Sequence, residues 1–357
     1  MSTEKNLTYH EQNFIDNTIR LREILTTLPP FAKEFFRAIE PTTSSKTRIS
    51  YAYDIRVFFR FLLENNPAFK NYEITDFTIS DIENLDPLDI EEYQEYLKVY
   101  HVDETGYATT NSEKGLSRKM SALRTFYKYY FKKEMITKNP TLLVDMPKLH
   151  DKAIIRLDAD EVAMLLEHIE NRGNGLTGQA LVYHNKTKIR DLAICTLLLG
   201  TGIRVSELVG LDLNDIDFKN NGITVTRKGG NQMVVYFGDE VCDALLNYLE
   251  KDRSSVEALP GNENALFLSS QKKRIGIQAV ENLVKKYARE VTPNKKITPH
   301  KLRSTYGTAL YKETGDIYLV ADVLGHKDVN TTRKHYAAID EDRRRSAANV
   351  VKLRENL

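Results

Sequence analysis

Six polar residues in the C-terminal half of the chain could together act on a phosphate ester. They supply two guanidinium cations, two imidazoles, one lysine ammonium and one phenol. Each type is common in proteins, and no pair of these residues is diagnostic by itself. The six are Arg204 in TGIRVSEL, Lys228 in TRKGGNQ, His300 and Arg303 in PHKLRST, His326 in LGHKD, and Tyr336 in TTRKHY.

A phenol with an ordinary pKa of about 10 is a poor nucleophile at neutral pH. It becomes effective when its proton is removed and when fixed cations neutralise the charge that develops on the phosphate. Two arginines and a histidine can neutralise this charge, and a lysine can protonate the leaving 5′-oxygen. The six residues therefore predict phosphodiester cleavage by attack of tyrosine, with no metal ion and no other cofactor.

Two of these residues lie at predicted helix starts. Arg204 follows the break Gly200-Thr201-Gly202, where helix amides can help a guanidinium to hold a phosphate, and Glu207 lies one turn later and could orient it. A surface ion pair is the simpler explanation of Arg204 and Glu207 alone. His300 and Arg303 follow Thr298-Pro299, a helix cap and first residue, and their spacing places both on one face.

The other three residues carry weaker signals. Lys228 lies in a predicted hairpin turn, where a lysine is usually only solvated. His326 follows Gly325, which would end a helix in the left-handed conformation, so this histidine could also be a simple helix cap. Tyr336 lies in or beside a short helix near 330–332, and it competes with a core role because the chain has 19 tyrosines.

The elements that must position these residues change character along the chain. Hydrophobic spacing and turn residues predict helices over 8–27, 31–38, from the cap TTSSKT (42–47), near 90–99, and over 113–134, which together form an all-helical N-terminal unit. Further helices are expected over 163–169, 189–199, 239–251, 277–290, 299–312 and 316–324, with a polar loop over 171–187. Three strands are expected over 215–218, 223–226 and 233–237.

The charge pattern favours a polyanionic partner. The net charge is only +1, but the segment 114–133 has seven basic residues and no acidic one, whereas 73–104 has eleven acidic residues and one basic one. One face of the helix over 113–134 is apolar, with Leu116, Met120, Leu123, Tyr127 and Tyr130. A solvated face is the alternative, but together with the downstream set the basic residues indicate DNA contact. The predicted DNA-binding residues are Lys114, Arg118, Lys119, Arg124 and Lys128.

The composition excludes several classes of protein. Cys195 and Cys242 both lie in apolar helical contexts, which indicates neither a disulfide framework nor a zinc site and suits a reducing cytoplasm. The N-terminus has no apolar signal region, and no run of 18 apolar residues occurs. We therefore expect a cytoplasmic protein that does not cross a membrane.

The motifs resemble those of the tyrosine recombinases of the phage integrase family, and most closely the two-domain bacterial Xer type. TGIRVSEL resembles the first arginine box, PHKLRST the His-x-Leu-Arg box, and LGHKDVNTT with the following tyrosine the closing box. KGGNQMVVYFG is similar to the hairpin lysine motif and selects Lys228. Ser304 stands where many relatives have a second histidine, and the spacing from His326 to Tyr336 is ten where nine is common.

The resemblance implies a mainly α fold with a small antiparallel β-sheet, in which a helical core-binding domain and an α+β catalytic domain form a C-shaped DNA clamp. The expected divisions are a helical N-terminal extension (1–41), a helical SAM-like DNA-binding domain (42–145), a linker (146–158), a catalytic domain (159–340) and an amphipathic tail (341–357) that docks on a neighbouring subunit.

The resemblance also implies a reaction. Arg204, Lys228, His300, Arg303 and His326 would activate the scissile phosphate, and Tyr336 would attack it to form a 3′-phosphotyrosine. The implied partners are double-stranded DNA with inverted-repeat half-sites, a homotetramer on two duplexes and a DNA translocase, in chromosome dimer resolution. The alternatives are a mobile-element integrase, a type IB topoisomerase, and an inactive DNA-binding protein of the same fold.

Overall fold

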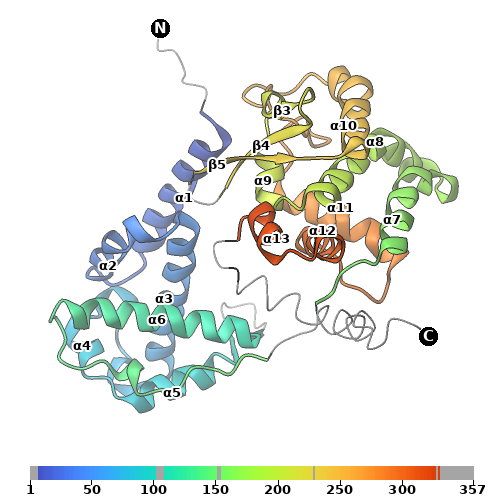
Figure 1. The fold of residues 1–357 in the computed structure, drawn as a ribbon. Helices are drawn as coiled ribbons and strands as arrows, with labels where there is room; N and C mark the ends of the chain where they lie inside the picture. Colours follow the sequence, from blue (N-terminus) through green and yellow to red (C-terminus); the bar gives the residue numbers. More distant parts are fainter. Residues whose placement is uncertain (1–6, 102–107, 151–153, 228–229, 327–328, 330–357) are drawn as a thin grey trace, which may run out of the picture. The chain divides into compact units, whose positions relative to one another are not determined.

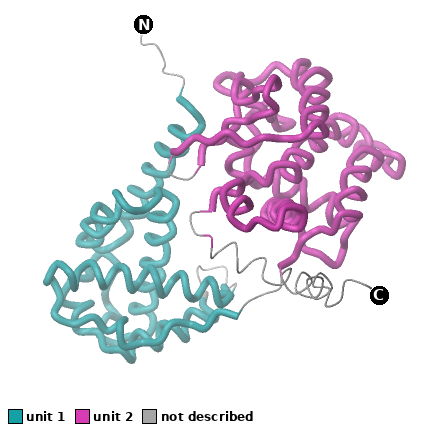
Figure 2. Tube along the Cα trace, viewed as in Figure 1, with its two compact units in different colours: residues 1–152 teal, residues 153–357 magenta. Residues whose placement is uncertain are grey.

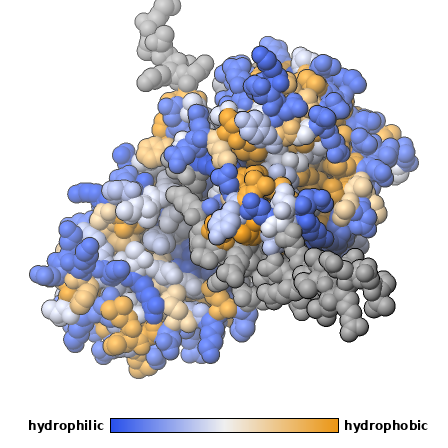
Figure 3. Space-filling view, viewed as in Figure 1, coloured by the Kyte–Doolittle hydropathy of each residue, from blue (hydrophilic) through white to orange (hydrophobic). Residues whose placement is uncertain are grey.

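The computed structural model describes residues 7–101, 108–150, 154–227, 230–326 and 329. The chain divides into two compact units, residues 1–152 and 153–357 (Figure 2). This division lies within the segment 146–158 that the sequence suggests as a linker. Figure 3 shows a mainly hydrophilic surface on each unit, interrupted by small hydrophobic patches.

The first unit is built from six α-helices and one short hairpin in its described part (Figure 1). The helices are α1 (Tyr9–Leu25), α2 (Ala32–Ala38), α3 (Ser45–Asn65), α4 (Ile79–Glu83), α5 (Pro87–Tyr96) and α6 (Glu113–Lys132). The strands β1 (Val99–His101) and β2 (Ala108–Thr110) pair antiparallel. Short 3₁₀ turns occur at Glu40–Thr42, Pro67–Phe69, Ile74–Asp76 and Pro140–Leu142.

The prediction of an all-helical first unit is therefore wrong at one place. We expected a helix near 90–99, but α5 ends at Tyr96 and Val99 begins a strand. Val99 and Tyr100 have the branched and aromatic side chains that favour strands, and they pair with Thr110 and Thr109. Helix α4 was not predicted, because its five residues are too short to show a hydrophobic period.

Aromatic side chains fill the core of the first unit. Phe58, Phe59 and Phe126 are fully buried, and Phe126 lies edge-on to Phe35 at 5.1 Å between ring centroids. Leu21 of α1 and Phe35 of α2 belong to the same cluster as residues of α3 and α6. The described part of the expected extension 1–41, residues 7–41, thus shares one core with the helices that follow it.

The second unit is α+β in its described part, with a small antiparallel sheet beside a set of helices (Figure 1). The helices are α7 (Ala159–Asn171), α8 (Gly178–Thr201), α9 (Val205–Gly210), α10 (Asp239–Lys251), α11 (Ile277–Val291), α12 (Pro299–Thr314) and α13 (Ile317–Leu324), with 3₁₀ turns at Arg172–Gly175, Leu213–Asp215 and Arg253–Ser255. The strands β3 (Ile216–Asp217), β4 (Gly222–Thr226) and β5 (Gln232–Tyr236) form one antiparallel sheet in that order. The mainly α fold with a small antiparallel sheet is confirmed.

The polar loop predicted over 171–187 is wrong, because α8 already begins at Gly178. The buried side of this first half of α8 is polar and includes His184 and Thr187. The hydrophobic period therefore gave no helical signal there. Further along α8 the buried residues include the apolar Ala193, Ile194, Leu197 and Leu198, within the apolar helix predicted over 189–199, and the helix ends at Thr201 with Gly202 as its cap.

Gly202 is the C-cap of α8. It has the left-handed conformation, with φ 64°, and lies close to side chains of α12 and α13. A Cβ atom at this position would lie 2.4 Å from Tyr306 Cδ1 and 2.9 Å from Leu324 Cδ2. Backbone conformation and space thus both require glycine here.

In the described part of the chain, no helix is long and apolar enough to span a membrane.

We expect Gly202→Ala to lower the free energy of unfolding by about 2–4 kcal/mol, because alanine is strained at positive φ and its methyl group overpacks the site. Urea denaturation followed by circular dichroism measures this loss. Gly175→Ala is the matched control, since a Cβ atom there meets nothing within 4 Å. Equal stability of the two variants would contradict the close packing at Gly202.

Candidate active site

The carbonyl end of α13 brings together three arginines from distant parts of the chain. Gly325 has φ 61° and turns the chain so that the His326 N–H donates to Ala321 O at 2.8 Å. The last carbonyls of a helix have no partners within the helix and carry partial negative charge. Each of three successive carbonyls accepts one arginine N–H: Val323 O from Arg227 (2.8 Å), Leu324 O from Arg303, and Gly325 O from Arg204 (3.3 Å).

Arg204 is held from two sides. It is the N-cap residue of α9, and the Glu207 carboxylate accepts both its backbone N–H at 2.8 Å and its Nη1–H at 2.7 Å. The Glu207 side chain is 3% exposed, whereas that of Arg204 is 36% exposed. The predicted orienting role of Glu207 agrees with this geometry, which leaves part of the Arg204 guanidinium open to a ligand.

Arg303 and His300 lie one turn apart on α12, but in different environments. Arg303 is 4% exposed, and its Nη1 donates to Gly202 O at 2.6 Å, so it joins the end of α8 to the end of α13. His300 is exposed at the start of the helix. The predicted cap and first residue, Thr298 and Pro299, begin α12 as expected.

His326 directly follows Gly325 and is half-buried, so the turn after α13 places it next to the carbonyl that holds Arg204. Lys228 and Tyr336 lie outside the described residues. Of the predicted set, Arg204, Glu207, Arg303 and His326 are thus brought to the end of α13, and His300 lies at the start of α12.

Arg227 is a residue of this cluster that sequence reasoning missed. It follows β4, and its backbone N–H donates to Asn231 O at 2.8 Å across the hairpin. Its Nε and Nη1 atoms are buried and have no hydrogen-bond partner among the described residues. Burial lowers the pKa of Arg227, Glu207 opposes this shift, and the neighbouring cation of Arg204 adds to it. The only signal in the sequence was its position next to Lys228.

The basic residues of α6 divide into exposed and internal ones. Lys114, Arg118 and Lys128 are exposed. Lys119, a predicted DNA-binding residue, is 7% exposed, and its Nζ donates to Asp54 Oδ1 at 3.3 Å, so its ammonium is held inside the unit. Its position on the buried side of α6 next to Met120 explains this, because the long stem packs inward while Asp54 neutralises the ammonium.

Arg118 and Arg124 also make internal contacts. Arg118 forms an ion pair with the same Asp54, although its own side chain is 46% exposed. Burial raises the pKa of Asp54, and the two cations Lys119 and Arg118 oppose this shift. The half-buried Arg124 donates to Thr141 O at 3.1 Å and to Val144 O, so it fixes the segment after α6 to the helix.

A hollow of about 260 Å³ lies between α3 and α6. Arg56 and Arg60 of α3 line it together with Arg118 and Lys119 of α6, so α3 extends the cationic surface that the sequence assigned to α6 alone. The Arg56 guanidinium lies over the Tyr53 ring at 4.9 Å from its centroid. The sequence pattern did not indicate Arg56 and Arg60, because acidic and apolar residues surround them and α3 has no continuous run of basic residues.

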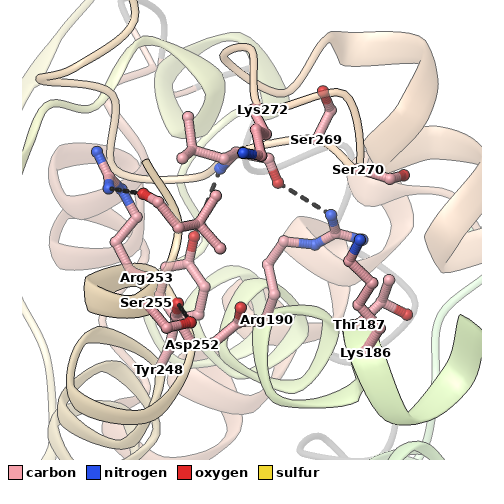
Figure 4. A pocket seen from close by; sticks show the side chains of 12 residues that line it. Lys186, Thr187, Arg190, Tyr248, Asp252, Arg253, Ser255, Ser269, Ser270 and Lys272 are labelled. Carbon is pink, nitrogen blue, oxygen red and sulfur yellow. Dashed lines mark hydrogen bonds between the residues drawn. The ribbon is translucent and has the colours of Figure 1, made fainter. Parts of the chain in front are cut away.

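A second cavity, of about 330 Å³, lies between α8, α10 and the segment near Leu268 (Figure 4). Its arginines are used internally: Arg190 donates to Asp191 and Leu268 O, and Arg253 donates to Ala265 O. None of the predicted site residues that the structure describes lines this cavity. Among the described residues, no group of three His, Cys, Asp or Glu side chains could hold a metal ion.

We expect Asp54→Asn to lower the free energy of unfolding of the first unit by about 3 kcal/mol, because the change leaves the buried Lys119 ammonium without its partner. The double variant Asp54→Asn with Lys119→Met should recover most of this loss. Urea denaturation of the three proteins measures both effects. An Asp54→Asn variant as stable as the wild type would contradict the internal role of this pair.

Comparison with known proteins identifies two matching family models. The phage integrase family matches residues 155–343, and the phage integrase SAM-like domain matches residues 27–144. Tyrosine recombinase XerC of Caldanaerobacter subterraneus subsp. tengcongensis is 33% identical over 333 residues, which cover 90% of this chain and 86% of that protein. Tyrosine recombinase XerS of Streptococcus agalactiae is 30% identical over 349 residues, with 91% and 96% covered.

Solved structures agree in fold. XerH site-specific recombinase bound to palindromic difH substrate superposes with a TM-score of 0.62 at 18% identity, over 86% of this chain and 79% of that one. The Tn1549 transposon integrase in complex with transposon right end DNA superposes with a TM-score of 0.61 at 19% identity, over 89% and 99%. On the strength of its domain matches and its relatives, the chain belongs to the phage integrase family, among the tyrosine recombinases.

Proposed function

We propose that this protein is a site-specific DNA recombinase that cuts and rejoins strands through a transient 3′-phosphotyrosine and a Holliday junction. The observation that carries the proposal is the convergence of Arg204 and Arg303 on the end of α13, next to His326. Carbonyl groups fix both guanidiniums, and one carboxylate also holds Arg204, so the two cations are positioned in advance to bind a phosphate diester.

In the proposed first step, the phenol oxygen of Tyr336 bonds to phosphorus while the bond from phosphorus to the 5′-oxygen breaks. His300 assists removal of the phenol proton, and Lys228 gives a proton to the leaving 5′-oxygen. Arg204, Arg303 and His326 donate hydrogen bonds to the non-bridging oxygens, where negative charge develops. Loss of one such donor costs about 10²–10³ in rate.

In the second step, the 5′-hydroxyl of the partner duplex attacks the phosphotyrosine and releases Tyr336. One phosphoester bond forms for each that breaks, so the chemistry needs no nucleotide hydrolysis. A type IB topoisomerase would instead rejoin the same strand. The recombinase reaction requires two duplexes, and we propose a homotetramer on two sites with inverted-repeat half-sites. The tail 341–357, which lies outside the described residues, would dock on a neighbouring subunit.

DNA binding by the first unit rests on α3 and α6. Arg56 and Arg60 line the hollow between these helices, and Lys114, Arg118 and Lys128 are exposed on α6. Cations grouped in this way neutralise phosphates without reading sequence. Lys119 and Arg124 would support this surface from inside, through Asp54 and the carbonyls near Thr141.

For the biological role we propose chromosome dimer resolution in the cytoplasm, with a DNA translocase as a candidate partner. The support is the match to relatives named XerC and XerS over most of the length of both chains. A mobile-element integrase is the competing role, and the DNA that the enzyme traps decides between them.

A nicked suicide substrate tests the chemistry. With a library of nicked host DNA and no divalent metal, we expect the wild type to form a covalent protein–DNA adduct and Tyr336→Phe to form none. Tyr318→Phe is the matched control, since this tyrosine is 72% exposed on α13 and should leave the adduct unchanged. An adduct that persists in Tyr336→Phe would move the nucleophile elsewhere, and sequencing of the trapped DNA names the site.

The cationic surface has its own test. Lys128→Ala should weaken DNA binding and reduce the slope of log K against log salt concentration by about 0.9, the value for one lost phosphate contact. The exposed Lys251 at the end of α10 provides the control variant Lys251→Ala, with no expected change. Fluorescence anisotropy across a salt series measures both, and equal slopes for the two variants would remove Lys128 from the DNA surface.

A further inference from the structure

Arg227 joins two parts of the second unit that carry proposed catalytic groups. Its backbone closes the β4–β5 hairpin through Asn231 O at 2.8 Å and Gly230 N–H at 3.0 Å. Its Nη2 donates to Val323 O at 2.8 Å, near the end of α13. Lys228 directly follows Arg227 in the chain, and His326 directly follows the Gly325 cap of α13. The side chain of Arg227 is thus a strut between the hairpin and the helix end.

The contact with Gly325 makes this strut specific. A Cβ atom on Gly325 would lie 1.0 Å from Arg227 Nη1, so the guanidinium occupies the space that any side chain at this position would need. The Gly325 carbonyl, in turn, accepts from Arg204 Nη2 at 3.3 Å. A shift of Arg227 would therefore displace the carbonyl that holds Arg204.

Stability alone does not account for Arg227. Among the described residues, its buried Nε and Nη1 atoms have no partner that replaces their lost hydration, and the positive charge of Arg204 adds repulsion that the Glu207 carboxylate offsets in part. Buried groups of this kind concentrate at functional sites. Because Nε and Nη1 are buried, however, they are closed to a phosphate oxygen, which points to action through neighbours and not to direct contact with DNA.

We propose that Arg227 is a positioning residue for strand cleavage: it fixes the start of the turn that carries Lys228 relative to the end of α13 that orients Arg204 and carries His326. The inference rests on the proposed function of Lys228 as proton donor to the 5′-oxygen. Misplacement of such a donor by about 1 Å can cost about 10²-fold in rate, even when substrate binding is intact.

Single-turnover cleavage by the full-length protein tests this role. We expect Arg227→Ala to cleave about 10–100-fold more slowly than the wild type, with DNA affinity within about two-fold. Arg227→Lys keeps the charge but loses the planar contact with Gly325, and it should show a smaller defect. Lys219→Ala is the matched control. Lys219 is exposed and precedes the start of β4, whereas Arg227 follows its end, so this variant should cleave like the wild type.

A substrate with sulfur in place of the bridging 5′-oxygen separates positioning of the proton donor from other roles. A thiolate leaves without protonation, because a thiol has a pKa of about 8.5, far below that of an alcohol. This substrate should restore cleavage by Lys228→Ala. If Arg227 acts through Lys228, it should also restore most of the rate of Arg227→Ala.

The outcomes are distinct. Rescue of Lys228→Ala without rescue of Arg227→Ala overturns the positioning role and leaves the proposed function intact. No rescue of either variant overturns both the donor role of Lys228 and the inference. A wild type that forms no adduct with either substrate overturns the proposed function itself. A loss of DNA affinity in Arg227→Ala as large as its loss of rate would show a general structural role and also overturn the inference.

Discussion

The carbonyl end of α13 is the constraint on which the site depends. Three arginines that lie far apart in the chain each donate to one of three successive carbonyls there. The positive charges of the three arginines repel one another, and the partial negative charge of the helix end offsets part of that repulsion. Since carbonyls are neutral groups, these contacts leave the positive charge of Arg303 and Arg227 uncompensated, although the buried Nε and Nη1 of Arg227 are closed to direct contact with a phosphate.

The first unit uses its cations in two ways. Some stand on its surface, such as Lys128, and others are built into it, such as Lys119 with Asp54 and Arg124 with the carbonyls near Thr141. The internal ones brace α6 against α3 and against the segment after α6. The basic helix α6 therefore also has a structural role, and not every one of its cations is available to bind a phosphate.

Local signals in the sequence predicted the parts of the site that local physics decides. Gly325 in the left-handed turn, the Thr298-Pro299 start of α12 and the pairing of Arg204 with Glu207 depend on neighbours within a few residues. Tertiary contacts decide the rest. The inward turn of Lys119, the strut made by Arg227 and the polar buried start of α8 depend on segments far away in the chain, which no spacing pattern encodes.

The grouping of three arginines at the end of α13 has a thermodynamic consequence for phosphate binding. Within the part of the chain that the structure describes, burial of Arg227 gives its Nε and Nη1 no new partners, and burial lowers the pKa of this guanidinium. A bound phosphate diester would lower the electrostatic potential around these cations and relieve part of the cost of that burial. A ligand that binds only the folded chain stabilises it, so a phosphate diester bound beside these arginines would raise the free energy of unfolding of the second unit.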